Sequence, residues 1–283
     1  MRQVNFLVKR SAFEREDVGV VGRFFRALGV GLACLYGMGA ASAAELKISF
    51  AELAAIIQTV IGDAKLHLHN KPGGLLDFTA TSNLTIAGQQ IPITIPPKSF
   101  DLLGSTYAYY VDDLNSSSFK VSAVASALRL MVNFESKGAD LVGGCVSGEC
   151  GLANGLPKII WTNGTVAIDV VPIRSGNRLT LQAKAVTIGG PMRASCDDVS
   201  GFFSFGTCEI ALNYANRAIT QTRPQIAAML KDTVNGPEAQ AKIANSLKKY
   251  LVLGPAGEIS ITDVTSAVTM VSIKFRVVGA AGG

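Results

Sequence analysis

Long stretches that alternate apolar and polar residues in the second half of the chain constrain its fold more than any other feature. Such alternation predicts β-strands with one buried face, and it covers 121–134, 165–174, 178–188 and 258–278. The last stretch is too long to stay straight, so we expect a bulge near Asp263. The expected inward-facing residues are Leu128, Leu130, Val132 and Phe134 in the first stretch and Thr269, Val271, Ile273, Phe275 and Val277 in the last.

Turn residues connect these stretches into a predicted antiparallel meander. Asn163-Gly164 favours a type I′ hairpin that joins 158–162 to 165–174. Ser175-Gly176-Asn177 predicts a second turn, which leads into 178–188. Shorter strands are expected earlier in the chain, at 65–69, 77–86, 91–96 and from Tyr107.

Helices are predicted at two places in the sequence. Ser49 and Glu52 form a capping box in front of an apolar stripe that ends at Gly62. A later helical block covers 212–251, where Pro224 should kink or restart the helix and Pro237 should open a second one. The predicted fold class is therefore α+β: a long, curved antiparallel β-meander packed on amphipathic helices.

The first 43 residues have the features of a secretory signal peptide. A basic segment precedes the apolar run 27–41, which ends in the small residues Ala41-Ser42-Ala43. An N-terminal anchor helix that remains uncut is the alternative. We expect a single α+β domain over 44–278, a disordered tail over 279–283, and a periplasmic or secreted location.

Four cysteines follow the leader, in two local pairs. An even number of cysteines in an exported chain predicts disulfides, and we favour the pairs Cys145–Cys150 and Cys196–Cys208. A zinc site is the alternative, but the spacing does not match zinc modules and no histidine lies nearby.

The sequence contains no recognisable catalytic signature, so we predict that the protein is not an enzyme. Its two histidines, His67 and His69, fall on one face of one predicted strand. They could share a metal, but no third ligand is evident and a solvated face is favoured. We interpret Asp112-Asp113 as a turn. Neither a metal nor a cofactor is expected.

A second unusual feature is the segment between Cys196 and Cys208, which contains Phe202, Phe203 and Phe205. Three phenylalanines in a loop closed by a disulfide could form an apolar tip that touches a membrane or gates a pocket. The alternative is a core strand or hairpin turn that packs inward.

Charged residues make up only 17% of the chain. A typical soluble domain has about 25%. Of the 26 basic and 21 acidic residues, six and three lie in the leader. The remaining chain is therefore nearly neutral, and a nucleic-acid partner is not expected. This deficit of charge predicts a large apolar interior, filled either by side chains or by a ligand.

The order of elements resembles that of the tubular lipid-binding (BPI-like) superfamily. The resemblance rests on the early helix 49–61, the long strands 121–134 and 165–188, the helices in 212–251 and the final strand 258–278. It implies a non-catalytic carrier of lipid. Periodicity alone supplies the candidate ligand-lining residues, which are Leu53, Ile57, Leu128, Leu130, Val132, Ile219, Ile226, Ile273 and Phe275.

The leading hypothesis is an exported protein that binds or carries a lipid or another apolar ligand in an internal groove, with a membrane surface as a further candidate partner. One alternative is a structural or interaction protein of the cell envelope with a fully packed core. Another is a protein associated with the outer membrane. A helical block of this size and a Gly/Ala-rich tail argue against a membrane barrel.

Overall fold

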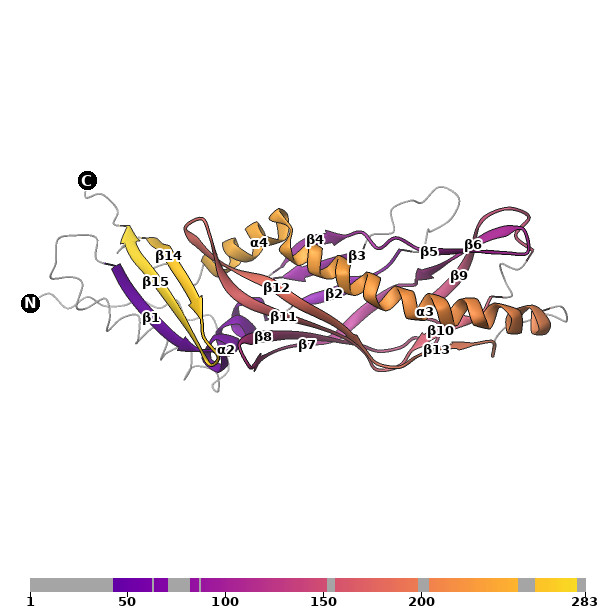
Figure 1. Cartoon of the computed structure of the whole chain (residues 1–283), viewed down its shortest axis with the longest axis horizontal. Helices are drawn as coiled ribbons and strands as arrows, with labels where there is room; N and C mark the ends of the chain where they lie inside the picture. The colour runs from indigo at the N-terminus through magenta and orange to yellow at the C-terminus, as the bar shows by residue number, and fades with distance from the viewer. Residues whose placement is uncertain are drawn as a thin grey trace, which may run out of the picture.

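Antiparallel β-strands form most of the structure, and three helices complete it among the residues that the computed structural model describes. The strands are grouped in three sheets along an elongated body (Figure 1). The prediction of a β-rich, curved antiparallel fold is confirmed. The described residues are 43–62, 64–70, 82–86, 88–151, 156–197, 204–248 and 258–278.

A seven-stranded sheet forms the middle of the molecule, in the order β12-β11-β8-β7-β2-β3-β4. Register shifts between Asp169 and Val170 and between Ser116 and Ser118 mark bulges or irregularities, and bulges increase the local twist and bend of a sheet. The strands are β2 (Lys65–Leu68), β3 (Ser82–Ile86), β4 (Gln89–Ile93), β7 (Leu114–Val124), β8 (Ala127–Phe134), β11 (Gly164–Ser175) and β12 (Arg178–Gly189).

Two smaller sheets lie at opposite ends of this sheet (Figure 1). At one end five strands pair in the order β13-β10-β9-β6-β5, and at the other end three strands pair in the order β1-β15-β14. The first and last strands of the described chain are therefore neighbours. The strands are β1 (Ala43–Ser49), β5 (Lys98–Leu102), β6 (Ser105–Val111), β9 (Leu141–Ser147), β10 (Lys158–Trp161), β13 (Met192–Ser195), β14 (Glu258–Ser266) and β15 (Met270–Val278).

The first helix, α2 (Phe50–Ile61), forms as the sequence predicts. The Ser49 hydroxyl accepts the backbone N–H of Glu52 at 3.2 Å, and the Glu52 carboxylate accepts the backbone N–H of Ser49 at 3.0 Å. Gly62 ends the helix, with its N–H bonded to the carbonyl of Gln58. The capping box thus satisfies donors that the first helical turn leaves free.

Two further helices follow the last strand of the five-stranded sheet. α3 (Ser204–Asn235) begins earlier than the sequence indicates and continues through Pro224 without a break. α4 (Pro237–Lys248) opens at Pro237, as predicted. α3 packs along β12 and β13, and α4 packs on β12.

Two predicted single strands are in fact hairpins. Stretch 121–134 turns at Ala125-Ser126 between β7 and β8, and stretch 258–278 turns at 267–269 between β14 and β15. Ala125 adopts a positive φ of 41°. The turn was concealed because it contains neither glycine nor asparagine, the usual residues for this conformation. The bulge expected near Asp263 is present, between Ile261 and Asp263.

The hairpin predicted at Asn163-Gly164 is wrong. β10 and β11 flank these residues but belong to different sheets, so the turn redirects the chain instead of pairing it. Gly164 is needed for packing, because a Cβ there would lie 2.8 Å from the indole ring of Trp161. Trp161 is buried and donates its Nε1–H to the carbonyl of Gly189 at 2.7 Å.

Candidate functional site

The two edges of the seven-stranded sheet face the same pair of helices. β12 and β4 are its outermost strands, and both contact α3 and α4. α3 runs lengthwise along the body (Figure 1), and the two helices together bridge the two edges of the curled sheet. This arrangement encloses an interior between the concave face of the sheet and the helices.

Half-buried side-chain amides attach the helices to the β12 edge. Asn235 at the end of α3 accepts the N–H of Ala183 at 2.8 Å and donates to the carbonyl of Ala183 at 3.0 Å. Gln240 in α4 donates to the carbonyl of Leu181 at 2.7 Å and accepts the hydroxyl of Thr180 at 2.8 Å. These side chains replace a neighbouring strand and satisfy an edge that would otherwise be open to pairing.

Within the described part of the chain, the β4 edge has fewer hydrogen bonds to the helices than the β12 edge has. Lys242 of α4 donates to the backbone carbonyl of Gln90 and forms an ion pair with Glu238 at 2.7 Å. Pro92 lies within β4, and proline is found in sheets on edge strands because it cannot donate to a neighbour. Among the described residues, β12 thus has more hydrogen bonds to the helices than β4 has.

Apolar side chains from all three sheets and all three helices fill the interior as one continuous cluster. The nine candidate lining residues all belong to this cluster. Seven are buried, while Leu130 and Ile219 are partly buried and pack against the others. The structure thus brings the nine residues together in the core, which is the arrangement that both a packed interior and a ligand-lined interior require.

The buried face of α3 contains a polar position that the sequence pattern did not reveal. Its inward stripe consists of small residues, Ala211, Ala215 and Ala218, before it reaches Thr222 and then larger apolar residues. Thr222 is 7% exposed, and its Oγ1 has no hydrogen-bond partner among the residues that the structure describes. Threonine occurs on both the buried and the exposed faces of helices, so the sequence pattern does not single out Thr222.

The two histidines meet Asp113 at the outer end of β2. His67 Nε2 lies 2.8 Å from Asp113 Oδ1, the N–H of Asp113 donates to His69 Nδ1 at 3.1 Å, and the two rings stack 5.9 Å apart. Lys137 adds an ion pair to the second carboxylate oxygen at 2.8 Å. These contacts, with Lys137 foremost, hold the pKa of Asp113 at about 2.

The turn predicted at Asp112-Asp113 lies between β6 and β7, where this polar cluster contacts it. Asp113 adopts a positive φ of 54° between β6 and β7. Its contacts hold it in this sparsely populated conformation. His67 and His69 are partly exposed and Lys65 on the same face is exposed, so solvent reaches this face of β2. Within the described part of the chain, no three histidine, cysteine or acidic residues are grouped to hold a metal ion.

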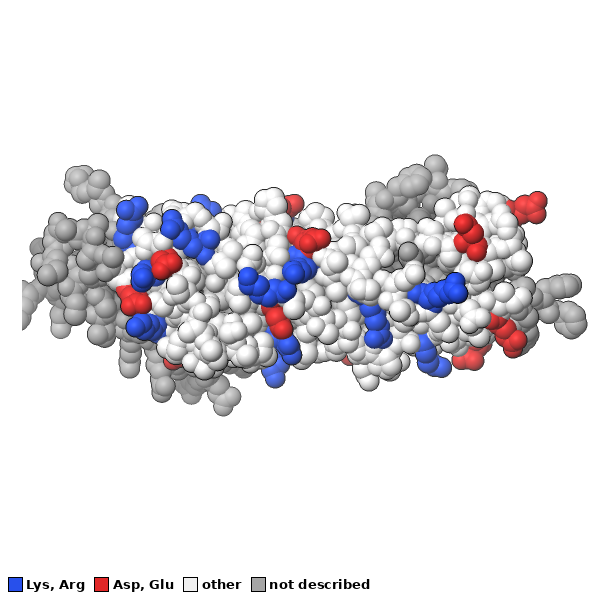
Figure 2. Space-filling model, viewed as in Figure 1, with Lys and Arg blue, Asp and Glu red and all other residues white. Residues whose placement is uncertain are grey.

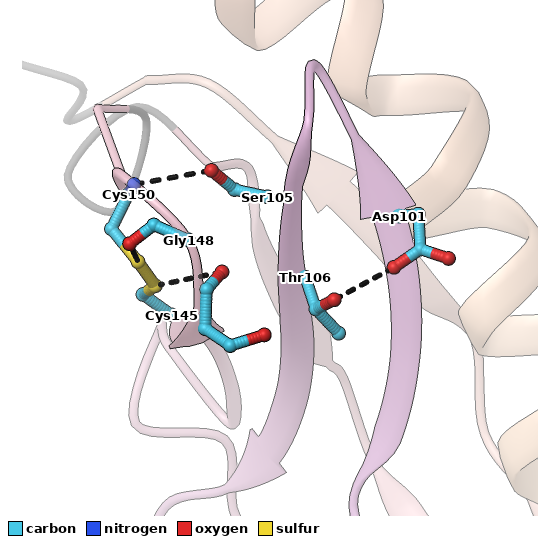
Figure 3. The surroundings of a disulfide bond; sticks show 7 residues. Asp101, Ser105, Thr106, Cys145, Gly148 and Cys150 are labelled. Carbon is cyan, nitrogen blue, oxygen red and sulfur yellow. Dashed lines mark hydrogen bonds between the residues drawn. A yellow bond between two sulfur atoms is a disulfide. The ribbon is translucent and has the colours of Figure 1, made fainter.

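Both predicted disulfides are present. Cys145–Cys150 closes a loop after β9, where the N–H of Cys150 donates to the Ser105 hydroxyl at 3.1 Å (Figure 3). Cys196–Cys208 links the end of β13 to α3. Two disulfides indicate an oxidising environment of the kind that exported proteins meet.

The segment between Cys196 and Cys208 ends in a helix and not in the strand or hairpin turn that was one alternative. Phe205 belongs to the first turn of α3, and the disulfide joins Cys208 of this helix to Cys196, the residue that follows β13. Phe202 and Phe203 lie outside the described residues. The apolar tip that touches a membrane therefore stays a prediction.

An aromatic cluster packs the N-terminal half of α3, through Tyr214, on the five-stranded sheet. Phe100 of β5 stacks on Tyr107, Tyr109 and Tyr214, with ring centroids 5.3–6.0 Å apart. Tyr109 donates its hydroxyl to the carbonyl of Pro157 at 3.1 Å, and burial raises the pKa of this hydroxyl. Sequence periodicity missed β5, and with it the anchor of this cluster.

The face of the molecule drawn in Figure 2 has few charges, in line with the composition. On the face in Figure 2, basic and acidic side chains are scattered over a surface that is mostly uncharged. No described helix is both long and apolar enough to cross a membrane. The sequence matches no protein-family model and no curated protein.

Proposed function

We propose that this protein is a non-catalytic, exported carrier that binds a lipid or another apolar ligand between its curled sheet and the helices α3 and α4. The observation that supports this proposal most is the continuous apolar interior, which runs from the three-stranded sheet to the five-stranded sheet beneath α3. An elongated apolar interior matches the shape of an acyl chain, and its few polar groups match the small number that orient a ligand in such sites.

The route of entry follows from the unequal attachment of the helices. Asn235 and Gln240 hold them on β12, whereas Lys242 supplies a hydrogen bond to β4. A ligand would enter by parting β4 from the helices while the β12 side acts as the hinge. The resemblance to tubular lipid-binding proteins agrees with this proposal. The signal peptide expected at 1–43 and the two disulfides support a periplasmic or secreted location.

Native mass spectrometry of the protein, purified without denaturant, tests the proposal. We expect a species heavier than the disulfide-bonded chain, and we expect the excess mass to be lost after extraction with organic solvent. A matched pair of variants locates the ligand: Ile226→Trp fills the interior, because Ile226 is 2% exposed, whereas Ile210→Trp changes an exposed position on the same helix.

The variants have opposite expected outcomes. Ile226→Trp should lower the ligand-bound fraction, and Ile210→Trp should leave it unchanged. An unliganded mass for the wild-type protein, together with no uptake of added hexadecanoate or hexadecan-1-ol, would overturn the carrier function. That result would favour the alternative of an envelope protein whose core is filled by its own side chains.

A further inference from the structure

We propose that Arg223 and Thr222, in the middle of α3, bind the anionic oxygen group of the ligand, a carboxylate or a phosphate attached to an acyl chain. This inference rests on the proposed carrier function and names the class of ligand. It arises from two buried polar atoms, on consecutive residues of α3, that the described part of the chain leaves without partners.

Thr222 Oγ1 and Arg223 Nε are the two buried side-chain polar atoms that lack a hydrogen-bond partner among the described residues. Buried polar groups are almost always paired, because an unpaired one costs free energy. Their coincidence at consecutive positions therefore points to a partner that the chain does not supply.

The surroundings of Arg223 favour an anion as this partner. Its Nη2 donates to the backbone carbonyl of Gly190, at the junction of β12 and β13, which fixes the guanidinium against the sheet. Among the described residues no carboxylate pairs with it, although the side chain is half-buried. A guanidinium presents parallel N–H donors that match the two oxygens of a carboxylate or phosphate.

Thr222 adds a second donor on the inward side. Its hydroxyl can donate to an oxygen acceptor, and it lies on the same buried stripe as Ala215 and Ala218. The small alanine side chains lie towards one end of α3, whereas Ile226 and Leu230 continue the stripe towards the other. An anionic head at Thr222 and Arg223 would thus project its chain along an apolar helix face.

Binding of a homologous series of single-chain ligands tests the assignment. Hexadecanoate, hexadecyl phosphate and hexadecan-1-ol share one chain and differ in the head, while inorganic phosphate carries a head without a chain. Titration calorimetry below the micellar concentrations should show hexadecanoate or hexadecyl phosphate binding about ten- to a hundredfold more tightly than the alcohol, as expected for hydrogen bonds to a charged group. Inorganic phosphate alone should bind far more weakly.

Three variants locate the effect. Arg223→Gln should abolish the preference for the anionic head while it leaves the affinity for hexadecan-1-ol unchanged. Arg217→Gln, which alters an exposed arginine on the same helix, should preserve the preference. Thr222→Val keeps the shape of the side chain and should weaken hexadecanoate binding about tenfold, as expected for the loss of one hydrogen bond to a charged group. It therefore tests the site even if Arg223→Gln fails to fold.

The outcomes separate this inference from the carrier function. Equal affinity for hexadecanoate, hexadecyl phosphate and hexadecan-1-ol would overturn the anion site and leave the carrier function standing. A Thr222→Val protein that unfolds at a higher temperature with unchanged affinity for the anionic ligands would also overturn it, because the hydroxyl would then be only an unpaired core group. Failure of all the chain-bearing ligands to bind would overturn both.

Discussion

Replacement of Asn235 by alanine should destabilise the protein far more than an exposed asparagine substitution does. Asn235 satisfies both the N–H and the carbonyl of Ala183, a residue that is 2% exposed on the edge strand β12. Each buried backbone group left unpaired costs about 1–3 kcal/mol. Because Asn235 is half-buried, water can replace part of the loss, and we expect a net cost of about 2–4 kcal/mol.

Thermal unfolding followed by circular dichroism, with the disulfides intact, measures this cost. For a domain of this size, a loss of about 3 kcal/mol lowers the midpoint by roughly 6–12 °C. Asn245→Ala is the matched control, because Asn245 is exposed on α4 and accepts one bond from Arg178 at 2.7 Å. Its cost should stay within about 0.5 kcal/mol. Equal midpoints for the two variants would refute the closure of the β12 edge by Asn235.

Three further predictions concern local contacts. Asp113→Asn should make the free energy of unfolding less dependent on acidic pH. The hydrogen bond from Lys137, foremost among its contacts, holds the pKa of Asp113 at about 2 in the folded protein, whereas the pKa in the unfolded chain is about 4. The carboxylate therefore stabilises the fold above about pH 4, and this stabilisation is lost as the pH falls towards the folded pKa. Urea unfolding across the acidic range checks it. Gly164→Ala should cost about 1–3 kcal/mol in urea unfolding, because its Cβ would clash with Trp161. Ser49→Ala should cost about 1 kcal/mol by the same measurement, through loss of the helix cap.

Features encoded by neighbouring residues could be predicted from the sequence. The capping box at Ser49, the helix start at Pro237 and the turn at Gly176-Asn177 each depend on residues a few positions apart, and each forms as expected. The two local disulfides belong to the same class.

Features that depend on distant residues could not be predicted in this way. The turn at Ala125 lacks the usual turn residues, so β7 and β8 looked like one strand. Asn163-Gly164 has the usual hairpin residues, but β10 instead pairs with β9 and β13, and Trp161 packs over the glycine. Local propensity was overridden by tertiary packing in both places.

The candidate site shows the same division. Ile226 and the other apolar candidates were identifiable because helical and strand periodicity reports which face is buried. Thr222 and Arg223 were not, because their significance lies in the absence of partners among the described residues. Asn235 and Gln240 were also missed, since nothing in the sequence near them indicates that their amides complete a strand edge.

The pairing of β1 with β15 affects the order in which the three sheets form during folding. Ser49 of β1 is paired with Met270 of β15, so roughly 220 residues are synthesised before the first strand meets its partner. Pairing across so long a stretch of chain is slow, because the entropy of closing the intervening loop is lost before the contacts form. Until β15 is in place, Leu46 and Ile48 lack the partner strand beside which they lie in the folded protein, and unpaired apolar strands are prone to aggregation. We therefore expect the three-stranded sheet to form late, and a chaperone that shields β1 until β15 is in place should raise the yield of folded protein.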